Sequence, residues 1–358
     1  MNILFIGPYR QSDGWGLAAR DYIEALVKTN HNISIKPVYL SPNIDNNISN
    51  NFKLLESNRF DKIDIVIQNV LPHLMDYYWG CKNIGLCYFE TLGWKNNWDL
   101  KLNLMDEIWI ASKKEKYILI NSNLKITINI VPIPINTDIK DIDSNFKLPT
   151  NDFKFYFIGE YIERKNLDKL VQAFHREFHK NESVKLILKL SKTGFSNQNL
   201  LSIIEQEFAK LKNSFGIYKD ISEYNNEFVI TDRLSYNDII GLHKECDCFV
   251  MPSSGESLCR PLMESVLVGN TAISTSNTGM DDSNPFYDLH VNSYEEPVLC
   301  HNKPMNDLYS LKELWQIPSI TDLQKKMRFV FENKIESKSD FINKFSYEEV
   351  SKTILDII

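Results

Sequence analysis

Short apolar strands alternate with helical stretches along most of the chain, and this alternation constrains the fold more than any other feature. Apolar runs predict strands at residues 2–6, 33–39, 63–68, 84–88, 107–111 and 126–131, and again at 153–158, 184–190, 227–230, 247–251 and 271–274. Strands that alternate with helices form mostly parallel sheets, because a parallel return needs a long crossover connection. We therefore expect an α/β fold.

A proline-rich and polar stretch divides this alternation into two series. Residues 131–149 contain three prolines and several polar residues, a composition typical of a linker. The 358 residues of the chain are long for one hydrophobic core and sufficient for two. We therefore expect two doubly wound, Rossmann-like domains, with residues 1–149 in the first and residues 150–339 in the second.

Composition and charge narrow the class of protein. The formal net charge of −7 argues against a nucleic-acid-binding surface, which is usually basic. No apolar run approaches the length that spans a bilayer, and the N-terminus is too short and too uncharged for a signal peptide. Six cysteines in a chain of this size are no disulfide framework, so we expect reduced thiols and a cytoplasmic location.

Two glutamates eight positions apart flank the start of a predicted helix. Glu256 lies in a Ser/Gly turn after the strand at 247–251, and Glu264 lies inside the helix that follows. Pro261 suits the first turn, where a missing N–H has no cost, and Gly269 suits the helix end. Free N–H groups between the carboxylates would bind an anion. This pattern favours a nucleoside-diphosphate sugar; the alternative is a surface helix with two solvated glutamates.

A second candidate segment follows the first strand of the second series. The strand at 153–158 ends at Gly159, and the loop after it carries Arg164 and Lys165 directly before a helix. Asn166 is the predicted N-cap of that helix. Two cations beside free amides suit a diphosphate leaving group. A solvated basic turn is the alternative interpretation.

These two segments resemble retaining glycosyltransferases of the GT-B fold, specifically family 4, also called glycosyl transferases group 1. The residues that match the E-x7-E motif of that family are Pro252, Ser253, Glu256, Pro261, Glu264, Gly269 and Ile273. The residues that match one branch of the family in the cation loop are Arg164, Lys165, Asn166, Leu170, Ala173 and Phe174. The chain departs from the pattern at Glu160, Cys259 and Thr271, where the family usually has Arg, Gly and Pro. The resemblance covers most of the second series and only patches of the first.

The resemblance implies an architecture and a reaction. Two Rossmann-like domains would face each other across a cleft, and a C-terminal helix at residues 340–358 would cross back to the first domain. The enzyme would move a sugar, of the hexosyl type, from a UDP- or GDP-linked donor to an acceptor hydroxyl of a glycan or glycolipid. The resemblance further implies retention of the anomeric configuration, and no cofactor or metal ion.

The resemblance also assigns roles to residues of the second domain. Glu264 would hold the ribose hydroxyls of the nucleotide, and Glu256 would contact the donor sugar and its developing positive charge. Arg164 and Lys165 would stabilise the departing diphosphate. The backbone amides that would bind the donor with them belong to Ser257, Leu258 and Cys259.

Residues 14–16 are candidates in the first domain. Gly14 and Gly16 open a helix after the first strand, and in the family the N–H groups of this loop approach the donor diphosphate. Trp15 between them would be an acceptor-side platform or a hydrophobic lid. A glycine pair after a first strand is also common without any such role.

Three further side chains stand at predicted carboxyl ends of strands, where ligands gather in α/β sheets. His73 and Glu90 are candidates for contact with the acceptor, and Lys189 is a candidate for contact with the donor. Each has an alternative interpretation. His73 would be a loop histidine with its hydrogen bonds made inside the protein, Glu90 a carboxylate that caps a helix, and Lys189 a side chain that extends to solvent.

Other functional classes fit the same features. A nucleotide-sugar epimerase shares the GT-B architecture and would turn over a donor without an acceptor. The negative net charge of the chain disfavours a DNA-modifying glycosyltransferase, and we expect no nucleic-acid partner. A non-catalytic nucleotide-sugar-binding module would bind donor without transfer. Peripheral association with the inner face of a membrane is compatible with a lipid-linked acceptor.

Overall fold

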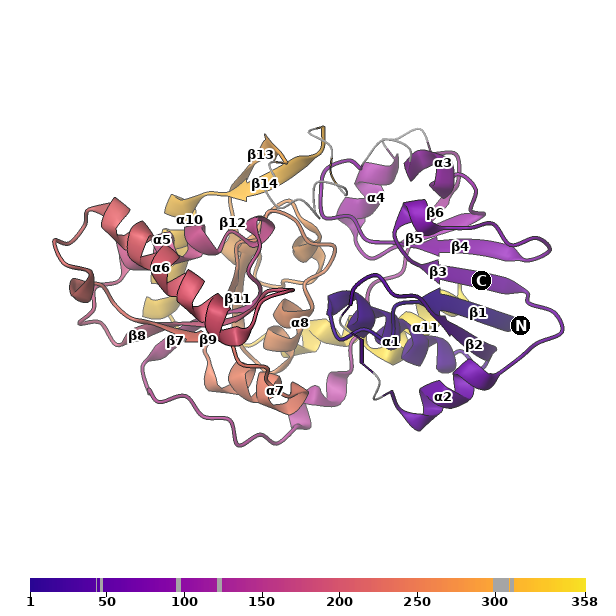
Figure 1. Cartoon of the computed structure of the whole chain (residues 1–358), viewed down its shortest axis with the longest axis horizontal. Coiled ribbons are helices and arrows are strands. Elements are labelled where there is room, and N and C mark those ends of the chain that lie inside the picture. Colours follow the sequence, from indigo (N-terminus) through magenta and orange to yellow (C-terminus); the bar gives the residue numbers. More distant parts are fainter. Residues whose placement is uncertain (43, 46–47, 95–97, 121–123, 299–308, 310–311) are drawn as a thin grey trace. The chain divides into compact units, whose positions relative to one another are not determined.

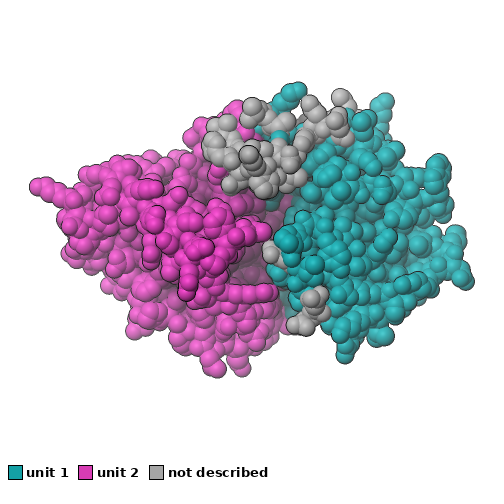
Figure 2. Space-filling model, viewed as in Figure 1, with its two compact units in different colours: residues 1–136, 301–313, 343–358 teal, residues 137–300, 314–342 magenta. Residues whose placement is uncertain are grey.

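The structure is a computed structural model, and it describes residues 1–42, 44–45, 48–94, 98–120, 124–298, 309 and 312–358. The chain forms two compact units, which Figure 2 shows in different colours. Unit 1 comprises residues 1–136, 301–313 and 343–358, and unit 2 comprises residues 137–300 and 314–342. The division therefore falls between residues 136 and 137, and most of the stretch predicted as a linker belongs to unit 2.

Unit 1 is built on a six-stranded parallel sheet with the order β2-β1-β3-β4-β5-β6 (Figure 1). The strands are β1 (Asn2–Gly7), β2 (Asn32–Pro37), β3 (Ile65–Asn69), β4 (Lys82–Leu86), β5 (Glu107–Ile110) and β6 (Thr127–Ile130). Every run predicted as a strand in the first series is a strand here, with small shifts at its ends. The chain order reverses between β1 and β3, the kind of position at which α/β sheets bind ligands.

The α-helices described in unit 1 are α1 (Gly14–Val27), α2 (Asn50–Ser57), α3 (Trp98–Leu102), α4 (Lys113–Ile120) and α11 (Tyr347–Leu355), with a 3-10 turn η1 (Pro72–Leu74). Ser346 is the N-cap of helix α11, and its side chain accepts a hydrogen bond from the N–H of Glu349. It packs on α1, where Tyr347 Oη donates to Asp21 Oδ1 at 2.7 Å.

Unit 2 contains a second six-stranded parallel sheet, with the order β12-β11-β10-β7-β8-β9. The strands are β7 (Phe153–Glu160), β8 (Val184–Ser191), β9 (Glu227–Ile230), β10 (Cys248–Met251), β11 (Thr271–Thr275) and β12 (His290–Val291). The chain order runs outward from β7 on one side and from β10 on the other, which is the arrangement of a Rossmann fold. The carboxyl ends of β7 and β10 therefore meet at the topological switch point.

The α-helices described in unit 2 are α5 (Leu167–Glu177), α6 (Asn197–Phe215), α7 (Tyr236–Glu245), α8 (Arg260–Leu267) and α10 (Ile320–Glu332). The 3-10 turns are η2 (Thr137–Asp141), η3 (Glu163–Lys165), η4 (Ile221–Glu223), η5 (Gly279–Asp282), η6 (Tyr287–Leu289) and η7 (Ser339–Phe345), the last at the boundary with unit 1. Asn166 occupies the predicted N-cap position of α5, although its side chain makes no cap hydrogen bond. Gly269 follows α8 with a φ of 104°, which suits the predicted helix stop.

An antiparallel hairpin was not predicted from the sequence. It consists of β13 (Ser293–Pro297) and β14 (Leu314–Pro318), which pair although they are far apart in the chain. The run of polar residues in β13 lacks the apolar character used to identify the other strands. The N–H of Gln316 in β14 donates to the carbonyl of Ser254 at 2.9 Å, so the hairpin supports the loop that precedes Glu256.

Among the described helices, none has the length and apolar character needed to cross a membrane. The five cysteines within the described residues are free thiols: Cys81, Cys87, Cys246, Cys248 and Cys259. Cys300 lies outside the described residues.

Candidate functional site

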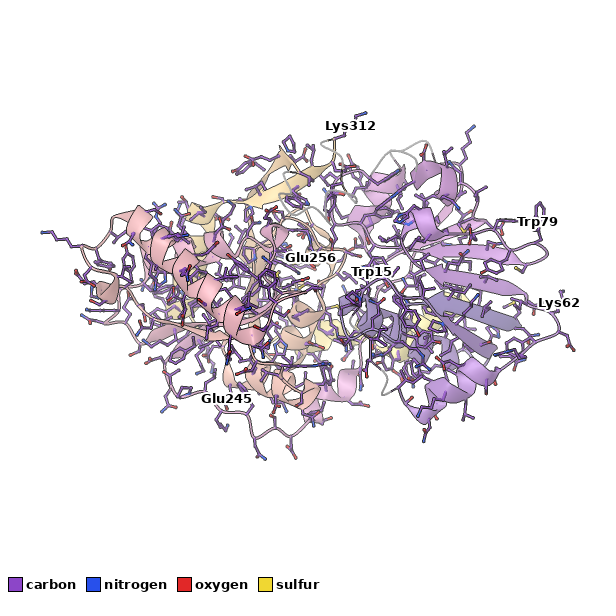
Figure 3. The ribbon with its side chains drawn as sticks, in the orientation of Figure 1. Trp15, Lys62, Trp79, Glu245, Glu256 and Lys312 are labelled. Carbon is purple, nitrogen blue, oxygen red and sulfur yellow. The ribbon has the colours of Figure 1, made fainter. Side chains whose placement is uncertain are left out.

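The candidate site of unit 2 lies at the switch point of its sheet. Strand β10 ends at Met251, and the loop that follows it carries Glu256, which Figure 3 labels. Strand β7 leads into η3, which carries Arg164 and Lys165. Because β7 and β10 are neighbours, the fold brings the cations and the carboxylate together although about ninety positions separate them.

Glu256 forms ion pairs with both predicted cations. Its Oε1 lies 2.5 Å from Arg164 Nη1 and 2.6 Å from Lys165 Nζ, and the residue is only 8% exposed. Burial raises the pKa of the Glu256 carboxyl, but the charges of Arg164 and Lys165 outweigh burial and lower this pKa to about 2. The carboxylate is therefore ionised at neutral pH. Both cations contact the same oxygen, Oε1.

Arg164 also fixes the loop beneath Glu256. Its Nη1 donates to Ser253 Oγ at 3.3 Å and to the carbonyl of Gly255, and its own carbonyl accepts from the N–H of Ser254 at 2.7 Å. The residue is 7% exposed. Arg164 therefore supports the loop and also pairs with Glu256. Among the described residues, the side chain of Lys165 forms its ion pair with Glu256.

The side chain of Asn166 bonds to the glutamate loop instead of capping α5. Its backbone is left-handed, with a φ of 50°, a conformation that Asn tolerates better than most residues. Its Nδ2 donates to the carbonyl of Pro252 at 2.9 Å and to Ser254 Oγ at 2.6 Å. Asn166 therefore ties the cation loop to the glutamate loop.

Gly279, at the start of η5, packs directly under the same loop. Its N–H donates to the carbonyl of Glu256 at 2.9 Å. A Cβ at position 279 would lie 1.7 Å from the carbonyl oxygen of Ser257, so only glycine fits there. No local pattern in the sequence reveals this role, because the glycine follows β11 and lies more than twenty positions after the loop it supports.

The segment between the two glutamates presents hydrogen-bond donors that the protein does not use. No described residue accepts a hydrogen bond from the backbone N–H of Ser257, Leu258 or Cys259. The Oγ of Ser257 is buried and also has no hydrogen-bond partner within the described part of the chain. Burial raises the pKa of the Cys259 thiol to about 12, so this thiol stays protonated. These donors stand at the start of α8, where an anion is favoured.

Glu264 lies in α8 and is 3% exposed. Its Oε1 accepts from Arg260 Nε at 2.8 Å and from Tyr236 Oη at 3.0 Å, while its Oε2 lies 3.5 Å from His243 Nε2. Burial raises the pKa of the Glu264 carboxyl, but Arg260 and His243 lower it to about 2. None of these three partners was predicted from the sequence. Only Arg260, four positions before Glu264 on the helix, has a spacing that could have revealed it.

Lys189 lies near the carboxyl end of β8 and is 8% exposed. Its Nζ donates to the carbonyl of Leu190 at 3.2 Å. Burial lowers the pKa of the ammonium group, against an opposing effect of Asp232. The predicted alternative of a lysine that reaches solvent does not fit this burial.

The predicted glycines of unit 1 lie at the start of α1, beside Trp15 (Figure 3). The N–H of Gly16 already has an acceptor, Asp13 Oδ1 at 3.0 Å. A Cβ at Gly16 would lie 2.1 Å from the carbonyl oxygen of Gln11, so this glycine serves close packing, whereas a Cβ at Gly14 would meet open space. The ring of Trp15 contacts the ring of Tyr88 edge-on at 4.7 Å.

His73 and Glu90 follow the neighbouring strands β3 and β4. His73 is exposed and its ring stacks at 6.0 Å from the ring of Trp98. Glu90 is half-buried and accepts from Tyr309 Oη at 3.4 Å. A buried carboxylate that the sequence analysis missed, Glu115, accepts from the backbone of the segment just before Glu90, at 2.7 Å from the N–H of Phe89.

Across the described residues, no group of three or more His, Cys, Asp or Glu side chains is placed to hold a metal ion. The only carboxylate–cation clusters described in the site of unit 2 are those of Glu256 and Glu264.

Comparison with known proteins agrees with this geometry. Residues 138–284, which include Arg164, Lys165, Glu256 and Glu264, match the family described as glycosyl transferases group 1. No curated protein sequence matches the chain.

Several solved structures share the fold. Sucrose-phosphate synthase from Thermosynechococcus elongatus is 13% identical with a TM-score of 0.66, and the match covers 100% of this chain and 98% of that one. A structure described as trehalose-6-phosphate from E. coli bound with UDP-2-fluoro glucose is 8% identical with a TM-score of 0.63, covering 99% and 98%. The N-terminal domain of Candida albicans trehalose-6-phosphate phosphatase is 12% identical with a TM-score of 0.61, covering 99% and 96%. The predicted fold class is confirmed: this is an α/β chain with the GT-B fold.

Proposed function

We propose that the protein is a glycosyltransferase that takes a sugar from a nucleoside-diphosphate sugar. The observation that carries the proposal is the set of unused donors at the start of α8: three backbone N–H groups and the Ser257 hydroxyl, between two ionised glutamates. Such a donor set suits a diphosphate, and the flanking carboxylates suit hydroxyl groups on either side of it. The match of residues 138–284 to glycosyl transferases group 1 supports the same assignment.

In the proposed reaction, the oxygen of an acceptor hydroxyl forms a bond to the anomeric carbon of the donor sugar. The bond from that carbon to the β-phosphate oxygen breaks, and its electron pair goes to the diphosphate. The departing phosphate oxygen takes the proton of the acceptor hydroxyl, so no separate protein base is needed. Attack on the face from which the diphosphate leaves retains the anomeric configuration, as in family 4.

Each part of the site has a proposed role in this reaction. Glu256 would accept hydrogen bonds from sugar hydroxyls and favour the positive charge that develops on the ring. Lys165 and the amides of Ser257 to Cys259 would stabilise the departing diphosphate, and Arg164 would hold the loop in place. Glu264 would accept hydrogen bonds from the ribose. Because Lys165 supplies a positive charge near Glu256, we propose that no metal ion is required.

The nucleotide and the acceptor are also proposals. A related structure holds UDP-2-fluoro glucose, so UDP-linked sugars are the first donors to test, followed by GDP-linked sugars. We propose that the acceptor is a hydroxyl of a glycan or glycolipid in the cytoplasm or at the inner face of a membrane. Contact of the acceptor with Trp15, His73 or Glu90 belongs to the same proposal.

The test has two steps. A thermal-shift screen over UDP-, GDP-, ADP- and TDP-sugars identifies the donor, since a ligand at a hundred times its Kd adds about 2.7 kcal/mol of stability. Incubation of that donor with candidate acceptors, followed by proton NMR of the product, then gives the linkage and the anomeric configuration. Stabilisation by no nucleotide sugar would contradict the proposal, and turnover of the donor without any acceptor would favour the epimerase.

The two glutamates are separated by calorimetry and kinetics. Glu264→Gln is expected to weaken binding of the free nucleoside diphosphate and of the full donor alike. Glu256→Gln is expected to retain binding of the nucleoside diphosphate and to lower kcat and kcat/KM together, because its contact is made chiefly in the transition state. The opposite pattern would reverse the assigned roles.

A further inference from the structure

A buried chain of hydrogen bonds lies directly behind Glu264. Asn270 Nδ2 donates to the carbonyl of His243 at 2.6 Å and to Tyr156 Oη at 2.9 Å, and Tyr156 Oη lies 2.7 Å from His243 Nδ1. Tyr156 belongs to β7 and His243 to α7, so the chain joins the sheet to a helix beside α8. Tyr156 and His243 are fully buried. None of these residues was singled out by the sequence.

The positions of the protons follow from the chemistry of these groups. A backbone carbonyl can only accept, so the contact with the carbonyl of His243 places the amide nitrogen of Asn270 there. The second N–H of that amide then donates to Tyr156 Oη, which leaves the tyrosine proton for His243 Nδ1. Burial raises the pKa of Tyr156 well above its ordinary value, so the hydroxyl keeps its proton. In the neutral ring of His243, the hydrogen is therefore on Nε2.

This Nε2–H lies near one oxygen of Glu264. The Nε2 atom is buried and makes no hydrogen bond within the described structure, and Glu264 Oε2 lies 3.5 Å from it. The other oxygen, Oε1, accepts from Arg260 and Tyr236. His243 is thus the donor recorded on the Oε2 side of the carboxylate, and a closer approach of a few tenths of an ångström would make a full hydrogen bond.

We propose that His243 is a positioning residue that orients Glu264, and that this orientation makes the nucleotide site select ribose over deoxyribose. The inference rests on the proposed function, in which Glu264 accepts hydrogen bonds from the ribose hydroxyls. A carboxylate that has donors beside both oxygens, and that gains the hydrogen bond from His243 on a closer approach, cannot rotate away from the two neighbouring hydroxyls of a ribose. Tyr156 and Asn270 contribute by fixing the tautomer of His243, without contact with the ligand.

The test compares UDP with 2′,3′-dideoxy-UDP by calorimetry in the full chain, with the matching GDP pair if the donor screen selects GDP. Hydrogen bonds from hydroxyls to a charged acceptor predict that the wild type prefers the ribonucleotide by about tenfold or more. In His243→Phe this preference is expected to fall to about threefold or less, with the affinity for pyrophosphate unchanged. His243→Gln, whose amide can donate at the same reach, is expected to restore most of the preference.

His175→Phe is the matched control, because His175 is a second buried histidine of unit 2, bonded to Glu227 at 2.5 Å. It is expected to lower the Tm of the protein yet leave the preference for ribose unchanged. A wild-type preference that persists in His243→Phe overturns this inference alone. A wild type that binds neither UDP nor GDP overturns the proposed function and this inference with it. Loss of the preference in His175→Phe also overturns the inference, because the effect of His243→Phe would then be general destabilisation.

Discussion

Gly279→Ala tests whether the packing beneath the glutamate loop sets the geometry of the site. A Cβ at position 279 would lie 1.7 Å from the carbonyl oxygen of Ser257, 2.5 Å from the carbonyl carbon of Ser257 and 2.6 Å from the carbonyl oxygen of Glu256. All three are backbone atoms, so no side-chain rotation relieves the clash. The loop that carries Glu256 and Ser257 must move instead.

The size of the effect follows from these distances. A carbon in ordinary contact lies about 3.2 Å or more from an oxygen, so the carbonyl of Ser257 must retreat by about 1.5 Å from its observed 1.7 Å. Overpacking of this kind costs about 1–3 kcal/mol of stability. A displacement of about 1 Å in a catalytic group can lower activity about a hundredfold. We therefore expect kcat/KM to fall by about a hundredfold in Gly279→Ala, beyond what its loss of stability explains.

The assay measures kcat/KM with the identified donor and acceptor at a temperature well below the Tm of each variant, together with urea unfolding. Gly85→Ala is the control, because its Cβ would lie 2.7 Å from Ile108 Cδ1 and 2.9 Å from Met75 Sδ in the core of unit 1. It is expected to lose stability and keep its kcat/KM. Gly279→Ala with nearly wild-type kcat/KM would refute the reasoning, since the loop would then tolerate displacement or the packing would relax elsewhere.

Three other expectations follow from the site. Lys165→Ala should lower kcat/KM about ten- to a hundredfold with little change in Tm, because Arg164 remains to pair with Glu256. Arg164→Ala should add a loss of stability on the order of 3 kcal/mol, because it also removes the buried bonds to Ser253 and Gly255; equal Tm values in thermal unfolding would contradict this difference. The pKa values of Glu256 and Glu264 fall from 4.5 to about 2 on folding, so each ionised carboxylate adds about 3 kcal/mol of stability above pH 4.5, and this is lost as the pH falls toward 2. In urea unfolding between pH 6 and pH 3, the free energy of unfolding should therefore decline less steeply in Glu264→Gln than in the wild type. Transfer should persist in excess EDTA, and a complete loss that Mg²⁺ or Mn²⁺ restores would show that a metal ion takes part.

The alternation of apolar runs was enough to predict most strands of both sheets. The central strands are buried on both faces, so their sequences are nearly continuous apolar runs bounded by polar segments. The edge strand β12 was missed, because it has only two residues. The β13–β14 hairpin was missed because β13 is mostly polar and exposed. Its partner strand lies many residues later, so no local turn signal joined the two.

The candidate site was predictable as a set of residues but not as a set of contacts. Glu256 and Lys165 stood out because each follows a predicted strand and precedes a predicted helix. Nothing in their spacing shows that Arg164 and Lys165 share one oxygen of Glu256, because that contact depends on β7 and β10 being neighbours. The side-chain partners of Asn166 were not predictable for the same reason, because they lie in the loop after β10, far along the chain.

The shared contact changes what Glu256 is expected to do. The sequence assigned the cations to the diphosphate and Glu256 to the sugar, as separate groups. In the structure, the single negative charge of Glu256 offsets part of the positive charge of Arg164 and Lys165, and leaves a net charge of +1 on the cluster. Glutamine at this position would keep the size of the side chain and remove that offset. Glu256→Gln should therefore bind the free nucleoside diphosphate at least as tightly as the wild type while transfer falls, so the nucleotide would accumulate as a tightly held inhibitor. Calorimetry with UDP or GDP at low and high salt measures this, since an electrostatic gain shrinks as salt screens it. Weaker nucleotide binding in Glu256→Gln would show instead that Glu256 holds Lys165 in place for the phosphate, and that the cation loop depends on the carboxylate for its order.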